Sequence, residues 1–397
     1  MRRRRVTRIF LSILRFILTA YGFRLVQFIL LYPQKTGYSP AMNLNFRSDY
    51  VIPKRFKKKY SSRFDWFNYQ INHKHDFVAA EFDFPSILQS LKAVDEIANR
   101  CFRKYGVFPI SFSCPNSQEI GNHSYPRQNF FSTTIPDLPY SFSSVAHYLD
   151  NYQKSAMALT HKKVGWDCFR HVEIMSVGTV PIMPDVRYIP EFTMVHYPKE
   201  FFKVSLEGFH NGLIPSRRNH EFILEWTRNH LTSISMARYM IRIAKLKPSR
   251  ILFIDEYLPD IPDYLSCMTL IGLKQLYGSM VTVAYPVDYI YTDYQKDTTS
   301  LYGKGFGYTK ILDKDFDTLQ DADAVSIDSL KNIEVFSKYD LIVIGSVSRN
   351  LEISNLLSKK EIAANKIFIW GDDRPRSRKE LKQIRRMDGY KFIREIY

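Results

Sequence analysis

The segment Thr160–Asp185 concentrates residue types that bind phosphate. A basic pair, Lys162 and Lys163, stands just before Gly165, and Asp167 follows two residues later. We expect a turn at the glycine and a helix capped by the aspartate. The free N–H groups at such a helix start, with two lysines beside them, suit a diphosphate.

Within this expected helix, Arg170 and Glu173 are three residues apart, so they share a face and can pair. An acidic residue one to two turns into the helix can accept hydrogen bonds from ribose hydroxyls. Gly178 is expected to end the helix, and residues 180–183 to return the chain to a sheet. The competing interpretation is a surface ion pair with Trp166 in the core. The grouping of charged residues around one helix start favours a ligand site.

This pattern resembles the signature of exostosin-like glycosyltransferases and, more loosely, the nucleotide-sugar domain of the GT-B fold. The residues that carry the resemblance are Lys162, Lys163, Gly165-Trp166-Asp167, Arg170, Glu173, Gly178 and Pro181, with Tyr152–Ser155 and Tyr197–Lys199 on either side. The resemblance implies two facing Rossmann-like domains, with the glutamate helping to hold the nucleotide. It also implies that no metal or further cofactor is required beside a nucleotide-sugar donor.

The second half of the chain alternates apolar strands with helices. Strands are expected over 250–255, 280–284, 339–345 and 366–370, with a helix over 265–276 closed by Gly278. Such alternation predicts a parallel sheet covered on both faces, that is, a second Rossmann-like domain. The resembled family places its donor domain second, whereas the donor-like segment here comes first. Either the domain order is permuted or the second domain has another task.

Three acidic residues follow the first strand of that second domain and are candidates for a catalytic base: Asp255, Glu256 and Asp263. Ligands bind at the carboxyl ends of strands in open α/β sheets, and a carboxylate there could deprotonate an acceptor hydroxyl. Solvated loop acids and a helix cap are the alternative. Nearby, the glycine-rich aromatic stretch Leu301–Tyr308 is either a cover for a ligand or a plain turn, and Asp372-Asp373 lacks a third ligand for a metal.

The first half is predicted to be one α/β unit. Its expected elements are helices over 85–103 and 144–159, a strand over 107–113, and a long amphipathic helical stretch over 219–246.

The positive charge belongs to the N-terminus. Of the net charge of +16, residues 1–60 hold +13, from fourteen basic residues and one acidic residue, which leaves +3 for the rest. This distribution argues against a nucleic-acid groove in the body and for a basic arm. The four cysteines form no CxxC pair, so we expect no zinc site and a reducing compartment.

Residues 1–33 contain an apolar run, Ile9–Tyr32, interrupted by Arg15 and Arg24. An interfacial amphipathic helix and a signal anchor both fit this composition, whereas a cleaved signal peptide fits poorly. Residues 34–60 read as a basic tether that adds attraction to an anionic membrane surface. We therefore predict a membrane-associated protein with a cytoplasmic body.

The predicted organisation is a membrane-associating helix over 1–33, a tether over 34–60, a donor-nucleotide domain over 61–250 and a second domain over 251–397. The predicted function is transfer of a sugar from a nucleotide donor to a glycan or lipid-linked acceptor. Two rivals are a non-catalytic scaffold of a polysaccharide-assembly complex and another nucleotide-dependent transferase.

Overall fold

The computed structural model describes residues 78–80, 91–115, 127–134, 142–314, 330, 333–358, 362–372, 374–375 and 377–396. The chain divides into two units, Met1–Lys74 and His75–Tyr397, and all described residues belong to the second. The predicted membrane arm and tether lie outside the described residues. Among the helices that are described, none is long and apolar enough to cross a bilayer.

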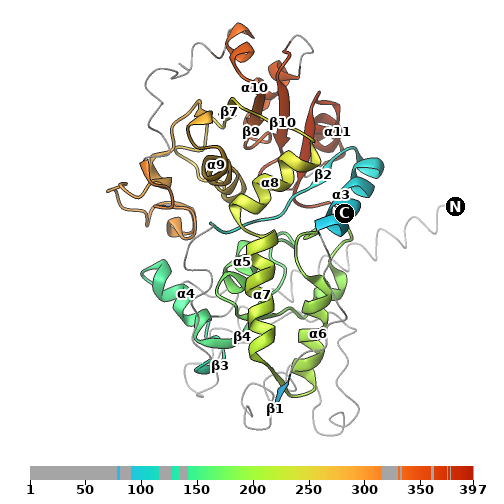
Figure 1. The fold of residues 1–397 in the computed structure, drawn as a ribbon, viewed down its shortest axis with the longest axis vertical. Helices are drawn as coiled ribbons and strands as arrows, with labels where there is room; N and C mark the ends of the chain where they lie inside the picture. The colour runs from blue at the N-terminus through green and yellow to red at the C-terminus, as the bar shows by residue number, and fades with distance from the viewer. Residues whose placement is uncertain are drawn as a thin grey trace, which may run out of the picture. The chain divides into compact units, whose positions relative to one another are not determined.

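A six-stranded, wholly parallel sheet is the larger of the sheets (Figure 1). Its strands are β2 (Phe108–Pro109), β7 (Ile251–Ile254), β8 (Val281–Val283), β9 (Leu341–Ile344), β10 (Asn365–Ile369) and β11 (Tyr390–Ile393). They lie in the order β2-β11-β10-β9-β7-β8. Every residue of β7 and β9 is buried, as their uninterrupted apolar sequence requires of a sheet covered on both faces. The predicted α/β class with a parallel sheet is confirmed.

The strand order of this sheet reverses direction once. The chain runs from β7 to β8 on one side, then returns to add β9 on the other side of β7. The strands β8-β7-β9-β10-β11 thus have the doubly wound order 2-1-3-4-5, whose reversal point lies between β7 and β9. In open α/β sheets, ligands bind outside the carboxyl ends of the strands at such a reversal point.

A three-stranded parallel sheet is formed by the first half of the chain, in the order β3-β4-β5. Its strands are β3 (Asn129–Phe131), β4 (Ser155–Leu159) and β5 (Val180–Ile182), and a separate parallel pair joins β1 (Val78–Ala80) to β6 (Leu213–Pro215). The helices here are α4 (Val145–Gln153), α5 (Phe169–Ser176), α6 (Lys199–His210) and α7 (Arg217–His230). Helix α5 connects β4 to β5, so its position follows from that parallel crossover.

Two expected helices differ from the structure. The helix predicted over 144–159 ends at Gln153, and Ser155–Leu159 is strand β4, with all five residues buried. The stretch predicted over 219–246 is two helices, α7 and α8 (Ser233–Ile243). They are separate because Thr232 adopts an extended backbone and its hydroxyl accepts from the N–H of Ser235, which caps a new helix.

The remaining helices are α3 (Leu91–Tyr105), α9 (Tyr264–Tyr277), α10 (Leu351–Leu357) and α11 (Arg378–Arg386). Short 3-10 turns occur at Val186–Tyr188, Gly278–Met280, Asp288–Ile290, Tyr302–Gly305 and Ile333–Lys338. Two elements that precede residue 250 associate with the second half: β2 pairs with β11, and α8 packs on α9. The three-stranded and the six-stranded sheets are therefore not separated by a single boundary in the sequence.

Candidate functional site

Helix α5, the expected phosphate-binding helix, starts without a side-chain cap. Its N-cap residue is Cys168, which makes no capping hydrogen bond. In contrast, side chains of Ser144, Thr232, Asp263 and Ser377 cap α4, α8, α9 and α11. In α5, therefore, no side-chain oxygen occupies the capping position, which is the position where an anion binds at a helix start.

Asp167 does not cap α5, and this prediction was wrong. Its carboxylate is buried and accepts hydrogen bonds from the N–H of Phe112 (2.9 Å) and the hydroxyl of Tyr197 (2.7 Å). Its own N–H donates to Glu395 Oε1 at 2.8 Å. Burial raises the pKa of Asp167 to about 6. Its partners come from distant parts of the chain, so Asp167 holds the segment in place.

Glu173 is buried, with 7% of its surface exposed, and its Oε2 accepts a hydrogen bond of 2.8 Å from Tyr148. Burial raises the pKa of Glu173 to about 7, and the charges of Arg170 and Lys163 act in the opposite direction. Arg170, within α5, and Lys163, before it, therefore both contribute positive electrostatic potential at Glu173. Arg170 is itself buried.

The segment before α5 is held by packing. The Lys162 ammonium lies 4.8 Å from the centre of the buried Trp166 ring, a cation–π contact. Gly165 lies so close to Glu395 that a Cβ there would be 2.6 Å from its Oε1. Lys163 is exposed, and its N–H donates to the carbonyl of Gly165 across a tight turn (3.1 Å). Of the predicted basic pair, Lys163 is the one presented to solvent.

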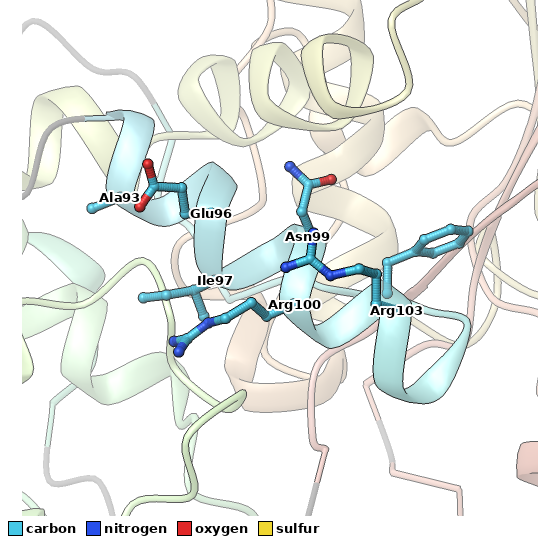
Figure 2. A pocket seen from close by; sticks show the side chains of 7 residues that line it. Ala93, Glu96, Ile97, Asn99, Arg100 and Arg103 are labelled. Carbon is cyan, nitrogen blue, oxygen red and sulfur yellow. The ribbon is translucent and has the colours of Figure 1, made fainter.

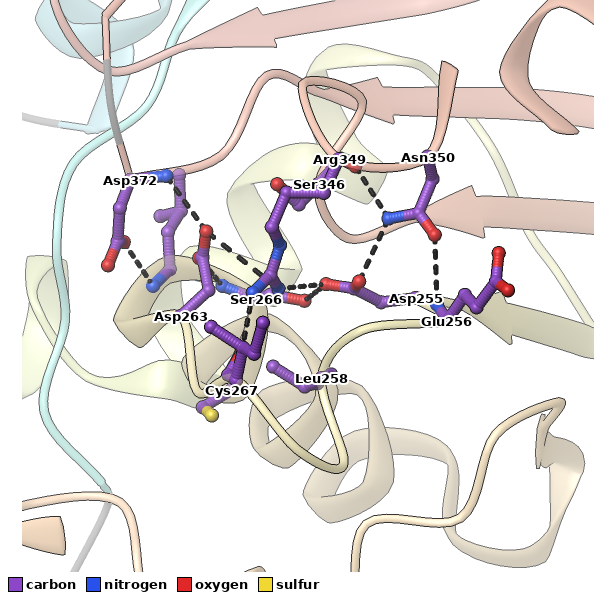
Figure 3. Close-up of polar contacts among 12 residues, drawn as sticks. Asp255, Glu256, Leu258, Asp263, Ser266, Cys267, Ser346, Arg349, Asn350 and Asp372 are labelled. Atoms are coloured by element: carbon purple, nitrogen blue, oxygen red, sulfur yellow. Dashed lines mark hydrogen bonds and ion pairs between the residues drawn. The ribbon is translucent and has the colours of Figure 1, made fainter. Parts of the chain in front are cut away.

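Asp255, at the end of β7, is the centre of a buried hydrogen-bond cluster (Figure 3). Its Oδ2 accepts from Ser266 and from Arg349, each at 2.7 Å, and its Oδ1 accepts from Asn350 at 2.8 Å. Arg349 and Asn350 follow β9, so the cluster joins the segments that follow β7 and β9. Burial raises the pKa of Asp255 even though the Arg349 charge opposes this. With both oxygens engaged, Asp255 positions its neighbours.

Asp263 and Asp372 form a carboxylate pair at the start of α9. Asp263 Oδ1 accepts from the N–H of Ser266 (2.8 Å), and its Oδ2 accepts from the N–H of Asp372 (3.1 Å). Asp372 in turn accepts from the N–H groups of Tyr264 (2.9 Å) and Leu265 (2.8 Å). Burial raises the pKa of both carboxyls, and the negative charge of Asp372 raises that of Asp263 further. Two buried carboxylates this close share one proton more readily than both ionise.

The other acidic candidates face solvent. Glu256 is exposed, and its contribution to the cluster is a backbone N–H that donates to Asn350 Oδ1 at 2.9 Å. Asp260 is also exposed. Asp255 and Asp263 both have raised pKa values, and that of Asp263, at about 7, suits general-base chemistry near neutral pH.

The starts of α5 and α9 meet. Phe169, the first residue of α5, stacks on Tyr264, the first residue of α9, with ring centres 4.3 Å apart. Phe112 packs edge-on against both, at 6.0 and 6.3 Å. The predicted donor-like helix start and the predicted acidic strand end are thus neighbours, although they are far apart in sequence.

Arg394, which the sequence did not reveal as a candidate, links the segment before α5 to the carboxylate pair at the start of α9. Its guanidinium donates to the backbone carbonyls of Asp167 and Asp372, pairs with Glu395 at 3.0 Å, and lies 4.2 Å from the centre of the Phe112 ring. The Glu395 carboxylate is negatively charged, and the two carbonyls belong to aspartates. The one buried cation of Arg394 therefore holds these groups together. Arg394 follows a short strand near the chain end, where no local pattern signals such a role.

A separate hollow of about 620 Å³ lies along α3 (Figure 2). Its described lining consists of Ala93, Glu96, Ile97, Asn99, Arg100, Phe102 and Arg103. None of the candidate site residues lines it.

Within the described part of the chain, no group of three or more His, Cys, Asp or Glu side chains is arranged to hold a metal ion. No family model, curated protein or solved structure matches this chain. The structure by itself defines an α/β protein with a six-stranded parallel sheet, in which the start of α5 contacts the start of α9.

The burial of Glu173 predicts a pH effect on stability. The folded state holds a proton on this carboxyl up to about pH 7, whereas its ordinary pKa is 4.5. Between these values the folded state binds more protons than the unfolded chain, so this group's contribution to stability falls as pH rises. Glu173→Gln should therefore lose less melting temperature than the wild type between pH 5 and pH 8.

Thermal melts at several pH values measure this difference, with Glu221→Gln on the exposed face of α7 as the control. The control should follow the wild type. Parallel curves for Glu173→Gln and the wild type would contradict the prediction.

Proposed function

We propose that the protein is a glycosyltransferase that uses a nucleotide-activated sugar to build a cell-surface polysaccharide or glycan. One observation carries this proposal: the uncapped start of α5 abuts the start of α9, where the Asp263–Asp372 pair lies, through the Phe169–Tyr264 stack at 4.3 Å. Transfer needs a phosphate-binding group and a base in one oriented site. This junction offers both.

In the donor half, the N–H groups of the first turn of α5 bind the diphosphate, and its partial positive charge favours an anion there. Lys163 and Arg170 neutralise the charge that develops on the leaving diphosphate, and Lys162 supports the preceding turn. Glu173, oriented by Tyr148, accepts hydrogen bonds from the ribose.

In the acceptor half, Asp263 removes the proton from the attacking hydroxyl. Its raised pKa, caused by burial and by Asp372, favours this role because a base works best when its pKa is near the working pH. Asp255 keeps Arg349 and Ser266 in place beside it. Glu256, being exposed, is the weaker candidate.

At the level of architecture, we propose that the two parallel sheets are the cores of two Rossmann-like domains in permuted order. The basic, apolar N-terminus holds the enzyme at a membrane with its body in the cytoplasm. A lipid-linked or surface glycan acceptor is the partner that such an anchor would serve.

A non-catalytic nucleotide-binding scaffold is the second candidate. It is favoured by the fact that both carboxylate oxygens of Asp255 and of Asp263 already accept hydrogen bonds from the protein. Such a protein would bind a nucleoside diphosphate without turning over its sugar ester.

We expect the purified protein to bind one of the diphosphates of uridine, guanosine or adenosine, and to hydrolyse the matching nucleotide-sugar slowly. Binding should raise the melting temperature, because the ligand is specific for the folded state. Lys163→Ala should weaken binding about tenfold or more, the effect of losing a charge-assisted hydrogen bond.

Lys203→Ala is the matched control, since Lys203 is a helix lysine paired with Glu200 at 2.5 Å and is distant in sequence from the site. It should leave binding unchanged. Binding without turnover would favour the scaffold, and absence of binding to all three diphosphates would disprove both candidates.

A further inference from the structure

The segment Leu301–Tyr308, here named the lid segment, covers the place where α5 and α9 begin. Three of its residues are glycine and three are aromatic. Its contacts reach both halves of the proposed site, and they are close enough to decide what can enter the junction.

On the α5 side, the lid segment rests on Phe169 and next to Glu173. A Cβ at Gly307 would be 2.6 Å from the Phe169 ring, so the backbone lies directly on that ring. Phe306 is buried and packs on Tyr148 with ring centres 5.9 Å apart. Tyr148 is the residue that donates to Glu173.

On the α9 side, the lid segment surrounds Tyr264. The ring of Tyr264 lies edge-on to Tyr302 at 5.5 Å and to Tyr308 at 5.1 Å. Gly303 contacts the Tyr264 hydroxyl so closely that no side chain would fit there. Tyr308 is fully buried, and its hydroxyl donates to the carbonyl of Tyr302 at 2.7 Å.

The backbone of the lid segment is suited to close contact with the Phe169 and Tyr264 rings. Four of its residues have positive φ: Gly303 and Lys304 at 59°, Gly305 at 73° and Gly307 at 81°. A non-glycine residue in this region costs about 1–2 kcal/mol, so the contacts of the closed segment must offset a strained Lys304. Residues 295–297, 299 and 300, just before it, are all exposed.

We propose that the lid segment is a closed cover over the nucleotide-binding junction and that it must open to admit a nucleoside diphosphate to the start of α5. This proposal rests on the proposed function. The Phe169 and Tyr264 rings, now covered by the lid segment, become accessible when it opens.

Gly307→Ala tests the proposal, because its methyl group collides with Phe169 only when the lid segment is closed. Gly278→Ala is the matched control: Gly278 also has positive φ, +53° against +81°, but a Cβ there meets nothing within 4 Å. If the lid segment is open in about one molecule in ten, a variant in which it is held open should bind the diphosphate about tenfold more tightly. We therefore expect Gly307→Ala to bind the diphosphate more tightly and faster, and Gly278→Ala to match the wild type.

A second readout needs no ligand. Tyrosine nitration followed by mass spectrometry should modify Tyr302, which is 64% exposed, in every variant. Tyr308, which is 0% exposed, should react slowly in the wild type and faster in Gly307→Ala. Phe306→Ala, which removes the contact with Tyr148, should act in the same direction if Gly307→Ala fails to fold.

The outcomes separate the two proposals. Faster nitration of Tyr308 together with tighter diphosphate binding supports the lid. Binding that is unchanged or weaker in Gly307→Ala overturns the lid and leaves the proposed function standing. Absence of binding in the wild type and in all variants overturns both.

Discussion

Asp263→Asn is expected to lower the rate of glycosyl transfer by about 10²–10⁴-fold, the range that a positioned general base contributes. The carboxylate is buried at the carboxyl end of the sheet and caps α9, so its position does not depend on substrate. Asparagine keeps an oxygen for the N–H of Ser266 but cannot accept a proton. Steady-state transfer or hydrolysis assays on folded protein measure the loss.

Glu256→Gln is the matched control, because Glu256 is an exposed carboxylate after the same strand. It should retain activity within about twofold. Asp372→Asn adds a second readout: the negative charge of Asp372 raises the pKa of Asp263, so removing it should move the acid limb of the pH–rate profile to lower pH. Full activity in Asp263→Asn, or an unmoved limb in Asp372→Asn, would exclude Asp263 as the base.

Arg394→Met is expected to destabilise the protein by about 3–5 kcal/mol, since removing one partner of a buried ion pair leaves uncompensated charge. Arg394 is buried and faces the Glu395 carboxylate and the carbonyls of Asp167 and Asp372. Methionine replaces most of the aliphatic volume but none of the donors. The free energy of unfolding in urea, compared with that of the wild type, gives the cost.

Arg217→Ala serves as the control for this loss of charge. Arg217 pairs with Glu221 at 2.7 Å, but its side chain is 71% exposed. Exposed pairs of this kind contribute about 0.3–0.5 kcal/mol, so the control should unfold close to the wild type. A cost below about 1 kcal/mol for Arg394→Met would mean that the buried cluster is held by packing alone.

Local sequence pattern predicted β7, β8, β9 and β10 of the larger sheet well because each is a mainly apolar run between turn residues, whereas it did not predict β11. Ile251–Ile254, Val281–Val283 and Leu341–Ile344 all form strands within the expected ranges. The pattern failed at Ser155–Leu159 for a physical reason. Alanine, methionine and leucine favour helix, but here burial of all five residues between two parallel neighbours outweighs that propensity.

The sequence also placed Asp255 correctly at a strand end, because the carboxyl edge of a parallel sheet follows from strand order, whereas Asp263 is the helix cap that the alternative interpretation expected. It did not reveal which groups hold Asp255. This carboxylate pairs with Arg349 and accepts a hydrogen bond from Asn350, and the positions of both depend on β9 lying beside β7. That adjacency joins residues about ninety positions apart and leaves no local pattern.

The sequence by itself therefore determined the α/β class, most strands of the larger sheet and the residue types that gather near the starts of two helices. Only the tertiary structure decided that these helix starts meet through Phe169 and Tyr264, that Asp167 holds the segment rather than caps it, and that Arg394 joins both sets. The reason is the separation in sequence over which each effect acts. Periodicity and turn residues act over a few neighbours, whereas burial and the contacts of Arg394 depend on segments 227 residues apart in the chain.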